Sequence, residues 1–250
     1  MNTVNLPLAG KVAVVTGGSR SIGAAIAKRL AADGATVAIT YNASPERADA
    51  VVNQIVAAGG QALALAADAG NPQAVRAAID EVANRFGRVD ILVNNAGISV
   101  LGAPEDIAFE DFEWILAVNV TGVFVATQQA LRHMGHGGRI INIGSSMVQY
   151  AAFGTASAYT LTKGALTGFS RGLVRDLGPR GITVNTVHPG PTDSDMNPAE
   201  GPVADFVRPN IAVGRYGEGQ DIASAVAYLA SPEAGFVTGA ELMVDGGFTA

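Results

Sequence analysis

Short apolar runs alternate along this chain with longer segments of helical pattern, which predicts an α/β fold. The apolar runs occupy residues 12–16, 36–41, 62–67, 91–93, 139–143, 183–187 and 241–244. The helical patterns occupy residues 24–32, 46–58, 73–86, 109–134, 156–177 and 221–230. Continuous apolar runs are typical of strands that are buried on both faces of a parallel sheet, and right-handed crossovers place helices on both faces. The sequence therefore predicts a doubly wound parallel sheet in three layers, a Rossmann-like fold.

The composition predicts one globular domain spanning residues 1–250. No linker rich in proline, serine or charge divides the 250 residues, and 48% of them are hydrophobic, which is ample for a core. No continuous apolar run reaches the roughly 18 to 20 residues that cross a bilayer, and residues 1–10 do not resemble a signal peptide. We therefore expect a cytoplasmic protein without a membrane partner.

Several classes of chemistry are disfavoured by residue counts. The absence of cysteine excludes disulfides, thiolate catalysis and cysteine zinc sites, and a net charge of −6 argues against a nucleic-acid partner. The three histidines, His133, His136 and His188, do not form a set with the spacing of metal ligands, so no metal is expected.

A glycine-rich turn, Thr16-Gly17-Gly18-Ser19-Arg20-Ser21-Ile22-Gly23, joins the first apolar run to the first helical segment. Between a strand and a helix, such a turn presents backbone N–H groups and a helix N-terminus to a pyrophosphate. A P-loop is excluded because no Gly-Lys-Ser/Thr sequence closes the turn. This turn predicts a dinucleotide site.

Tyr159 and Lys163 are four residues apart in a helical segment, and therefore share one face. The chain has only five tyrosines and three lysines, so chance pairing at this spacing is rare. An ammonium beside a phenol favours the phenolate, which predicts that Lys163 lowers the pKa of Tyr159 for proton transfer. A packed tyrosine beside a surface lysine is the competing interpretation.

Taken in order, these motifs resemble those of the short-chain dehydrogenase/reductase family over nearly the whole chain. The markers are the glycine turn, Asp68, Asn94-Asn95-Ala96-Gly97, Asn119, Ser146, Tyr159, Lys163 and Pro189-Gly190 followed by Thr192. The chain departs from the family at Ser21, where glycine is usual. The resemblance implies seven strands and catalysis of hydride transfer between a nicotinamide and a ketone or secondary alcohol. Extended relatives of the family, epimerases and dehydratases, have a different glycine spacing and usually a further substrate domain.

The resemblance also implies roles for the catalytic residues. Tyr159 exchanges a proton with the carbonyl oxygen, and Lys163 also binds the nicotinamide ribose. Asn119 holds a water molecule in the proton path. Ser146 orients the carbonyl; it is preferred to Ser145 because its separation from Tyr159 matches the family spacing, and Ser145 is the alternative.

The end of the second apolar run predicts NADP(H) as the cofactor. An NAD enzyme needs a carboxylate there, but Tyr41 occupies the position and no acid follows until Glu46. Arg20 offers a guanidinium to a 2′-phosphate. With the resemblance, the predicted cofactor-binding residues are Gly17, Ser19, Arg20, Ser21, Ile22, Gly23, Tyr41, Asn42, Ser44, Asp68, Ala69, Asn95, Ala96, Gly97, Tyr159, Lys163, Pro189, Gly190 and Thr192.

The substrate is expected to be a small ketone or alcohol in a mostly apolar pocket. Residues 193–210 have few regular signals and are predicted to form a flap over the site. The predicted substrate-binding residues are Ser146, Val148, Tyr150, Phe153 and Met196. Two other functions stay open, namely reduction of 3-oxoacyl thioesters and non-catalytic regulation by a bound dinucleotide.

A homotetramer is the expected assembly, because the family commonly forms tetramers through long helices and the C-terminal segment. Gly164, Ala165, Gly168 and Gly172 would allow close packing between helices, and residues 237–250 form an apolar tail that needs cover. In the competing interpretation, the small residues pack against their own sheet and the tail is frayed.

Overall fold

Seven parallel strands form a single sheet in the order β3-β2-β1-β4-β5-β6-β7, in a computed structural model that describes residues 6–250. The strands are β1 (Val12–Val15), β2 (Thr36–Tyr41), β3 (Gln61–Ala66), β4 (Ile91–Asn94), β5 (Arg139–Ile143), β6 (Thr183–Pro189) and β7 (Glu241–Val244). Each lies within a residue or two of the predicted run. The order reverses between β1 and β4, which places the cleft of a doubly wound sheet there. The predicted fold class is confirmed.

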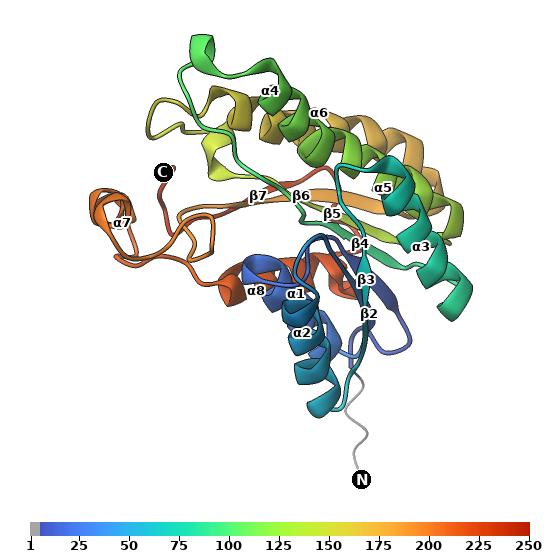
Figure 1. Cartoon of the computed structure of the whole chain (residues 1–250). Coiled ribbons are helices and arrows are strands. Elements are labelled where there is room, and N and C mark those ends of the chain that lie inside the picture. Colours follow the sequence, from blue (N-terminus) through green and yellow to red (C-terminus); the bar gives the residue numbers. More distant parts are fainter. Residues whose placement is uncertain (1–5) are drawn as a thin grey trace.

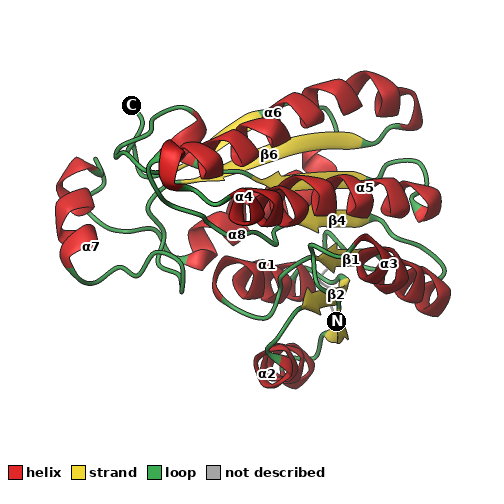
Figure 2. Cartoon of the chain, turned by 45° about the horizontal axis from the view of Figure 1, so that its top comes forward, coloured by secondary structure: helices red, strands yellow, loops and turns green. Residues whose placement is uncertain are grey.

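Helices cover both faces of the sheet (Figure 1). Those outside the flap are α1 (Ser21–Ala32), α2 (Pro45–Ala57), α3 (Pro72–Phe86), α4 (Phe109–Leu116), α5 (Gly122–His133), α6 (Ser157–Leu177) and α8 (Gly219–Ala230). One layer contains α1, α2 and α8, while α3, α4, α5 and α6 form the other (Figures 1 and 2). The three predicted layers are therefore present.

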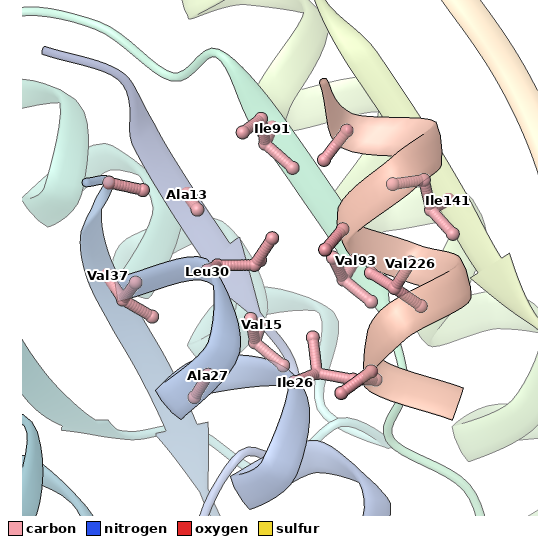
Figure 3. Packing of buried hydrophobic residues seen from close by; sticks show 14 of the residues in the cluster. Ala13, Val15, Ile26, Ala27, Leu30, Val37, Ile91, Val93, Ile141 and Val226 are labelled. Atoms are coloured by element: carbon pink, nitrogen blue, oxygen red, sulfur yellow. The ribbon is translucent and has the colours of Figure 1, made fainter. Parts of the chain in front are cut away.

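Alternation along each strand divides the core into two clusters, because successive side chains point to opposite faces. Ala13 and Val15 pack in the cluster beneath α1 and α8, whereas Val12 and Val14 pack in the cluster beneath α3 and α5. Figure 3 shows the first cluster, in which Ile26 and Leu30 lie over the sheet beside Val226. Burial on both faces explains why these strands are continuously apolar.

The long helical segment predicted at residues 109–134 is interrupted. A short π-helix, η2 (Ala117–Thr121), separates α4 from α5. By length and composition alone, Phe109–His133 could cross a membrane, but 56% of its most apolar window is buried inside the molecule. It packs beside α3 and α6, as a core helix does.

The predicted flap contains more regular structure than the sequence indicated. Helix α7 (Pro202–Val207) begins with proline at its first turn, and a 3₁₀ turn, η5 (Arg208–Asn210), follows it. In both overall views α7 lies at the same end of the molecule as the C-terminus (Figures 1 and 2). Proline is favourable at N1 because the missing N–H has no partner there in any helix.

Candidate active site

A cavity of about 720 Å³ lies at the carboxyl ends of the strands. Loops that follow β1 to β6 line it, together with the flap and the C-terminal tail. Every residue that the sequence predicted for cofactor binding contributes to this lining. The topology brings these loops together because the carboxyl ends of parallel strands share one edge of the sheet.

The glycine turn is shaped to approach a ligand with its backbone. Gly17 has a φ of 65°, and a Cβ there would lie 2.9 Å from the Cα of Ala96. Helix α1 begins at Ser21, and the side chain of its N-cap, Arg20, caps no backbone N–H group. Free N–H groups at a helix N-terminus attract anions, so the turn fits a dinucleotide pyrophosphate.

Asn95 braces this turn. Its side-chain amide donates to the carbonyl oxygens of Thr16 at 2.9 Å and Gly17 at 3.0 Å. The Thr16 hydroxyl accepts from the backbone N–H groups of Asn95 and Ala96, both at 3.0 Å. The loops after β1 and β4 are thus fastened together, which fixes the shape of the cleft.

Ser21, the departure from the family pattern, stands in the left-handed region with a φ of 47°. That conformation favours glycine, which is a physical reason for the glycine that the resemblance led us to expect here. The Ser21 hydroxyl accepts from the backbone N–H of Asp195 at 3.2 Å and contacts the Asp195 carboxylate at 3.4 Å. A side chain at this position therefore attaches the glycine turn to the flap.

Two arginines also donate hydrogen bonds to the carboxylate of Asp195, which belongs to the flap. Arg20 donates to Asp195 at 3.1 Å, and Arg47, at the start of α2, donates to the same oxygen at 2.6 Å. Hydrogen bonding to Arg47, more than to Arg20, holds the pKa of Asp195 below its usual value. The sequence analysis missed Asp195 and Arg47, because 175 residues separate Asp195 from Arg20.

Lys163 is buried at the floor of the cavity. Its side-chain Nζ donates to the carbonyl oxygen of Ile143 at 2.9 Å and lies 5.8 Å from the centroid of the Tyr159 ring. Burial lowers the pKa of Lys163 to about 8. A Cβ at Gly97 would lie 3.2 Å from this Nζ, so glycine leaves room for the ammonium group.

The pKa of Tyr159 differs from the prediction. Burial raises this pKa, and the nearby Ser145 side chain opposes the rise. The net shift is therefore upward, and a lowering of this pKa by Lys163 stays a prediction. The phenol is consequently protonated at neutral pH, and it is ready to act as a proton donor.

The Ser145 side chain approaches the Tyr159 phenol, which favours Ser145 over Ser146 as the serine that would contact a bound carbonyl. The Ser145 oxygen accepts from the backbone N–H of Met147 at 3.2 Å, which leaves its proton free to donate. Ser146 also lines the cavity, but it begins the 3₁₀ turn η3 (Ser146–Val148) and is only 3% exposed. The spacing favours Ser146 and the approach to Tyr159 favours Ser145, so the choice between the two serines stays a prediction.

Asn119 lies in the π-helical turn and is only 1% exposed. Its amide donates to the Ile98 carbonyl at 2.9 Å and to the Thr162 hydroxyl at 3.0 Å, and its oxygen accepts from the Ile98 N–H at 2.9 Å. Both amide protons are therefore in use, which leaves one lone pair on the oxygen for a water molecule. Asn119 joins the loop after β4 to α6, and its role in holding a water stays a prediction.

Only some of the residues predicted to bind the substrate line the cavity. Ser146, Phe153 and Met196 line the cavity, whereas Val148 and Tyr150 do not. Tyr150 is half exposed and packs edge-on against Phe248, with the ring centroids 5.8 Å apart. Several other lining residues were not predicted individually: Trp114, Ala152, Val207, Tyr216 and Phe248.

The sequence and fold match those of known proteins. A family model described as "Enoyl-(Acyl carrier protein) reductase" matches residues 17–249. A Burkholderia cenocepacia short-chain dehydrogenase, solved in complex with NADP, is 54% identical over 98% of this chain and all of its own, with a TM-score of 0.95. The chain belongs to the short-chain dehydrogenase/reductase family and is an oxidoreductase whose cofactor is NADP(H).

Two further relatives differ in their substrates. The angucycline C-6 ketoreductase LanV, solved with bound NADP, is 39% identical over 97% of each chain, with a TM-score of 0.92. A 3-oxoacyl-[acyl-carrier-protein] reductase of Synechocystis is also 39% identical, over 96% of this chain and 97% of its own. Similarity alone therefore does not separate these two substrate classes.

Proposed function

We propose that this protein reduces a neutral ketone to a secondary alcohol with NADPH. The contact between Tyr159 and Ser145, beside the buried Lys163 in the cavity, carries the proposal. When bound, the cofactor supplies the hydride. Ser145 donates a hydrogen bond to the carbonyl oxygen, and Tyr159 donates the proton that this oxygen acquires. These residues supply proton transfer and carbonyl polarisation, which a non-catalytic regulator would not need.

The residues around the second strand support selectivity for the 2′-phosphate. Arg20, Tyr41, Asn42 and Ser44 all line the cavity. No carboxylate stands at the end of β2 to repel a phosphate there. Arg20 would donate to this phosphate in the complex.

The walls of the cavity favour a neutral substrate. Phe153, Val207 and Phe248 supply apolar surface. Arg208, the cation of the flap, donates to the Ala199 carbonyl and stacks over the Tyr216 ring, 5.3 Å from its centroid. A 3-oxoacyl thioester is the second candidate, and the Synechocystis relative supports it.

A substrate panel tests the proposed function. We expect neutral cyclic and aryl ketones to have a higher kcat/KM than a 3-oxoacyl thioester, and NADPH to give a higher value than NADH. Oxidation of the reduced cofactor, followed by absorbance, measures both comparisons. A preference for the thioester would contradict the proposed ketone reduction and support 3-oxoacyl thioester reduction. Equal use of NADH and NADPH would contradict the proposed 2′-phosphate site.

We propose that the protein is a cytoplasmic homotetramer, and two separate exposed apolar faces support the assembly. On the first, Phe124 of α5 packs beside Phe169 of α6, with ring centroids 5.8 Å apart, and Leu161 is exposed nearby on α6. A Cβ at Gly164 or Gly168 would meet no atom within 4 Å, so these glycines face outward rather than toward their own sheet.

The second face lies at the edge of the sheet that β7 forms. Within the described residues 6–250, strand β7 pairs only with β6, and Phe236, just before β7, is fully exposed. Two self-complementary faces generate a tetramer with three two-fold axes.

Breaking one face should leave the other intact. We expect Gly168→Arg to give dimers, because a long cation would separate paired α6 helices. Light scattering coupled to size exclusion measures the mass of the 25.4 kDa chain's assembly. Gly135→Arg, at an exposed glycine with nothing near its Cβ position, is the control and should remain tetrameric. A monomeric native protein would contradict the proposed assembly.

A further inference from the structure

The turn that carries Ser145 begins where the pairing of β5 with β6 ends. The last paired residues of the two strands are Ile143 and Val187. Beyond this pair, the Gly144 N–H donates to the carbonyl oxygen of Val187 at 2.7 Å. The next bond of a parallel ladder would come from residue 189, but this residue is a proline and has no N–H. The backbone ladder therefore stops just before Ser145.

The side chain of His188, in β6, contacts the backbone of Ser145 instead. Its Nδ1 lies 3.2 Å from the backbone nitrogen of Ser145 and 3.0 Å from the carbonyl oxygen of the same residue. Burial lowers the pKa of His188, so the imidazole is neutral at neutral pH. Nδ1 then accepts from this N–H or donates to this oxygen, according to which ring nitrogen carries the proton. In either tautomer, the ring bonds the residue whose hydroxyl approaches Tyr159.

The surroundings of His188 leave its imidazole little freedom. The residue is fully buried, and Nε2 lies 3.6 Å from the carboxylate of Glu241. Glu241 accepts hydrogen bonds from Thr167 at 3.3 Å and Arg171 at 2.5 Å, both on α6. A Cβ at Gly144 would lie 2.4 Å from Nδ1, so glycine leaves room for the ring. The ring is therefore confined beside the turn that carries the serine.

We propose that His188 is a positioning residue for ketone reduction, which holds the backbone of Ser145 so that the Ser145 hydroxyl points to the substrate carbonyl. This inference rests on the proposed reaction and on Ser145 as the serine that contacts the carbonyl. His188 is fully buried and does not line the cavity, so it acts through Ser145 rather than on the substrate. Its loss should lower kcat and leave the affinity for NADPH nearly unchanged.

Three substitutions separate the two sides of the ring. His188→Asn places an amide group where Nδ1 stands, His188→Gln places one near Nε2, and His188→Leu has the outline of asparagine without its polar atoms. We expect the leucine and glutamine variants to lower kcat for reduction of 1-tetralone with NADPH by about tenfold, because the serine loses its orientation. The asparagine variant should stay within about threefold of the native kcat, since it can restore one hydrogen bond. Cofactor fluorescence should show an unchanged NADPH affinity, and melting temperatures identify any variant that is not folded.

A double-mutant cycle tests whether His188 acts through Ser145. Once Ser145→Ala has removed the hydroxyl, the orientation of that residue no longer affects the hydrogen bond to the carbonyl. We therefore expect His188→Leu to lower kcat by less than about twofold in the Ser145→Ala background, whereas independent effects would again give about tenfold. Losses that multiply, or an asparagine variant as impaired as the leucine variant, would overturn the inference. Native kcat in both the leucine and the glutamine variants would do the same.

Hydrogen exchange separates this inference from the proposed function. Mass spectrometry of a peptide that contains residues 144–147 measures exchange at the turn without any substrate. We expect faster exchange in His188→Leu and His188→Gln, and native exchange in His188→Asn. If this pattern appears but no ketone is reduced, the proposed reaction is wrong and the contact between His188 and Ser145 stands. If ketones are reduced but exchange is equal in all the variants, the reaction stands and the role of His188 is wrong.

Discussion

Replacement of Tyr159 by phenylalanine is expected to lower kcat by about 10²- to 10⁴-fold, the usual contribution of a general acid. The variant removes only the hydroxyl that would protonate the carbonyl oxygen. Steady-state reduction of the best ketone with NADPH measures the loss. NADPH affinity, followed by the change in cofactor fluorescence, should stay within a few-fold, because the rest of the cavity is unchanged.

The raised pKa of Tyr159 adds a pH dependence to this result. Reduction needs the protonated phenol, which predominates at neutral pH, so no proton must be lost before reduction. Alcohol oxidation needs the phenolate, and its kcat/KM should therefore rise as the pH increases above neutrality. An activity above a tenth of the native value in Tyr159→Phe would contradict the assignment of the general acid.

Ser145→Ala is expected to lower kcat/KM for ketone reduction by about 10²-fold, as when one donor to a developing oxyanion is removed. The Ser145 side chain lies near Tyr159, and its oxygen accepts from the Met147 N–H, so its proton is free for the carbonyl oxygen. The neighbouring change, Ser146→Ala, is a matched control of equal size in the same turn. We expect it to alter kcat/KM by no more than a few-fold.

The two variants distinguish Ser145, which the contact with Tyr159 favours, from Ser146, which the sequence spacing favours. Steady-state kinetics of both proteins under the same conditions, together with their melting temperatures, distinguishes a catalytic loss from a folding defect. The opposite pattern, with Ser146→Ala as the damaging change, would restore the assignment based on its distance from Tyr159 in the sequence.

The different positions of the Ser145 and Ser146 side chains have a local cause in the backbone. Ser145 is extended, with φ and ψ of −163° and 145°, and the chain turns into a 3₁₀ helix at Ser146. Adjacent residues on such a bend point in different directions. Residues 149–156, between η3 and α6, contain no helix, so a residue count along them does not fix which hydroxyl reaches the phenol.

The sequence by itself determined the features that depend on short stretches of chain. Apolar runs set the strands, the glycine turn after β1 set the phosphate-binding loop, and four-residue spacing placed Tyr159 and Lys163 on one helical face. Such features are set by local sterics and side-chain periodicity. The topology then brings all predicted cofactor residues to one cavity, because every parallel strand ends at the same edge.

Only the tertiary structure decided the contacts between distant segments. Asp195 reaches Arg20 and Arg47, and Tyr216 and Phe248 close one wall of the cavity, across separations that no local pattern specifies. The pKa of Tyr159 likewise depends on how deeply the fold buries this side chain of α6, since burial outweighs the lowering by the nearby Ser145 side chain. The candidate reacting groups could therefore be predicted from the sequence. Their protonation and the shape of the substrate pocket arise from packing and desolvation in the folded chain.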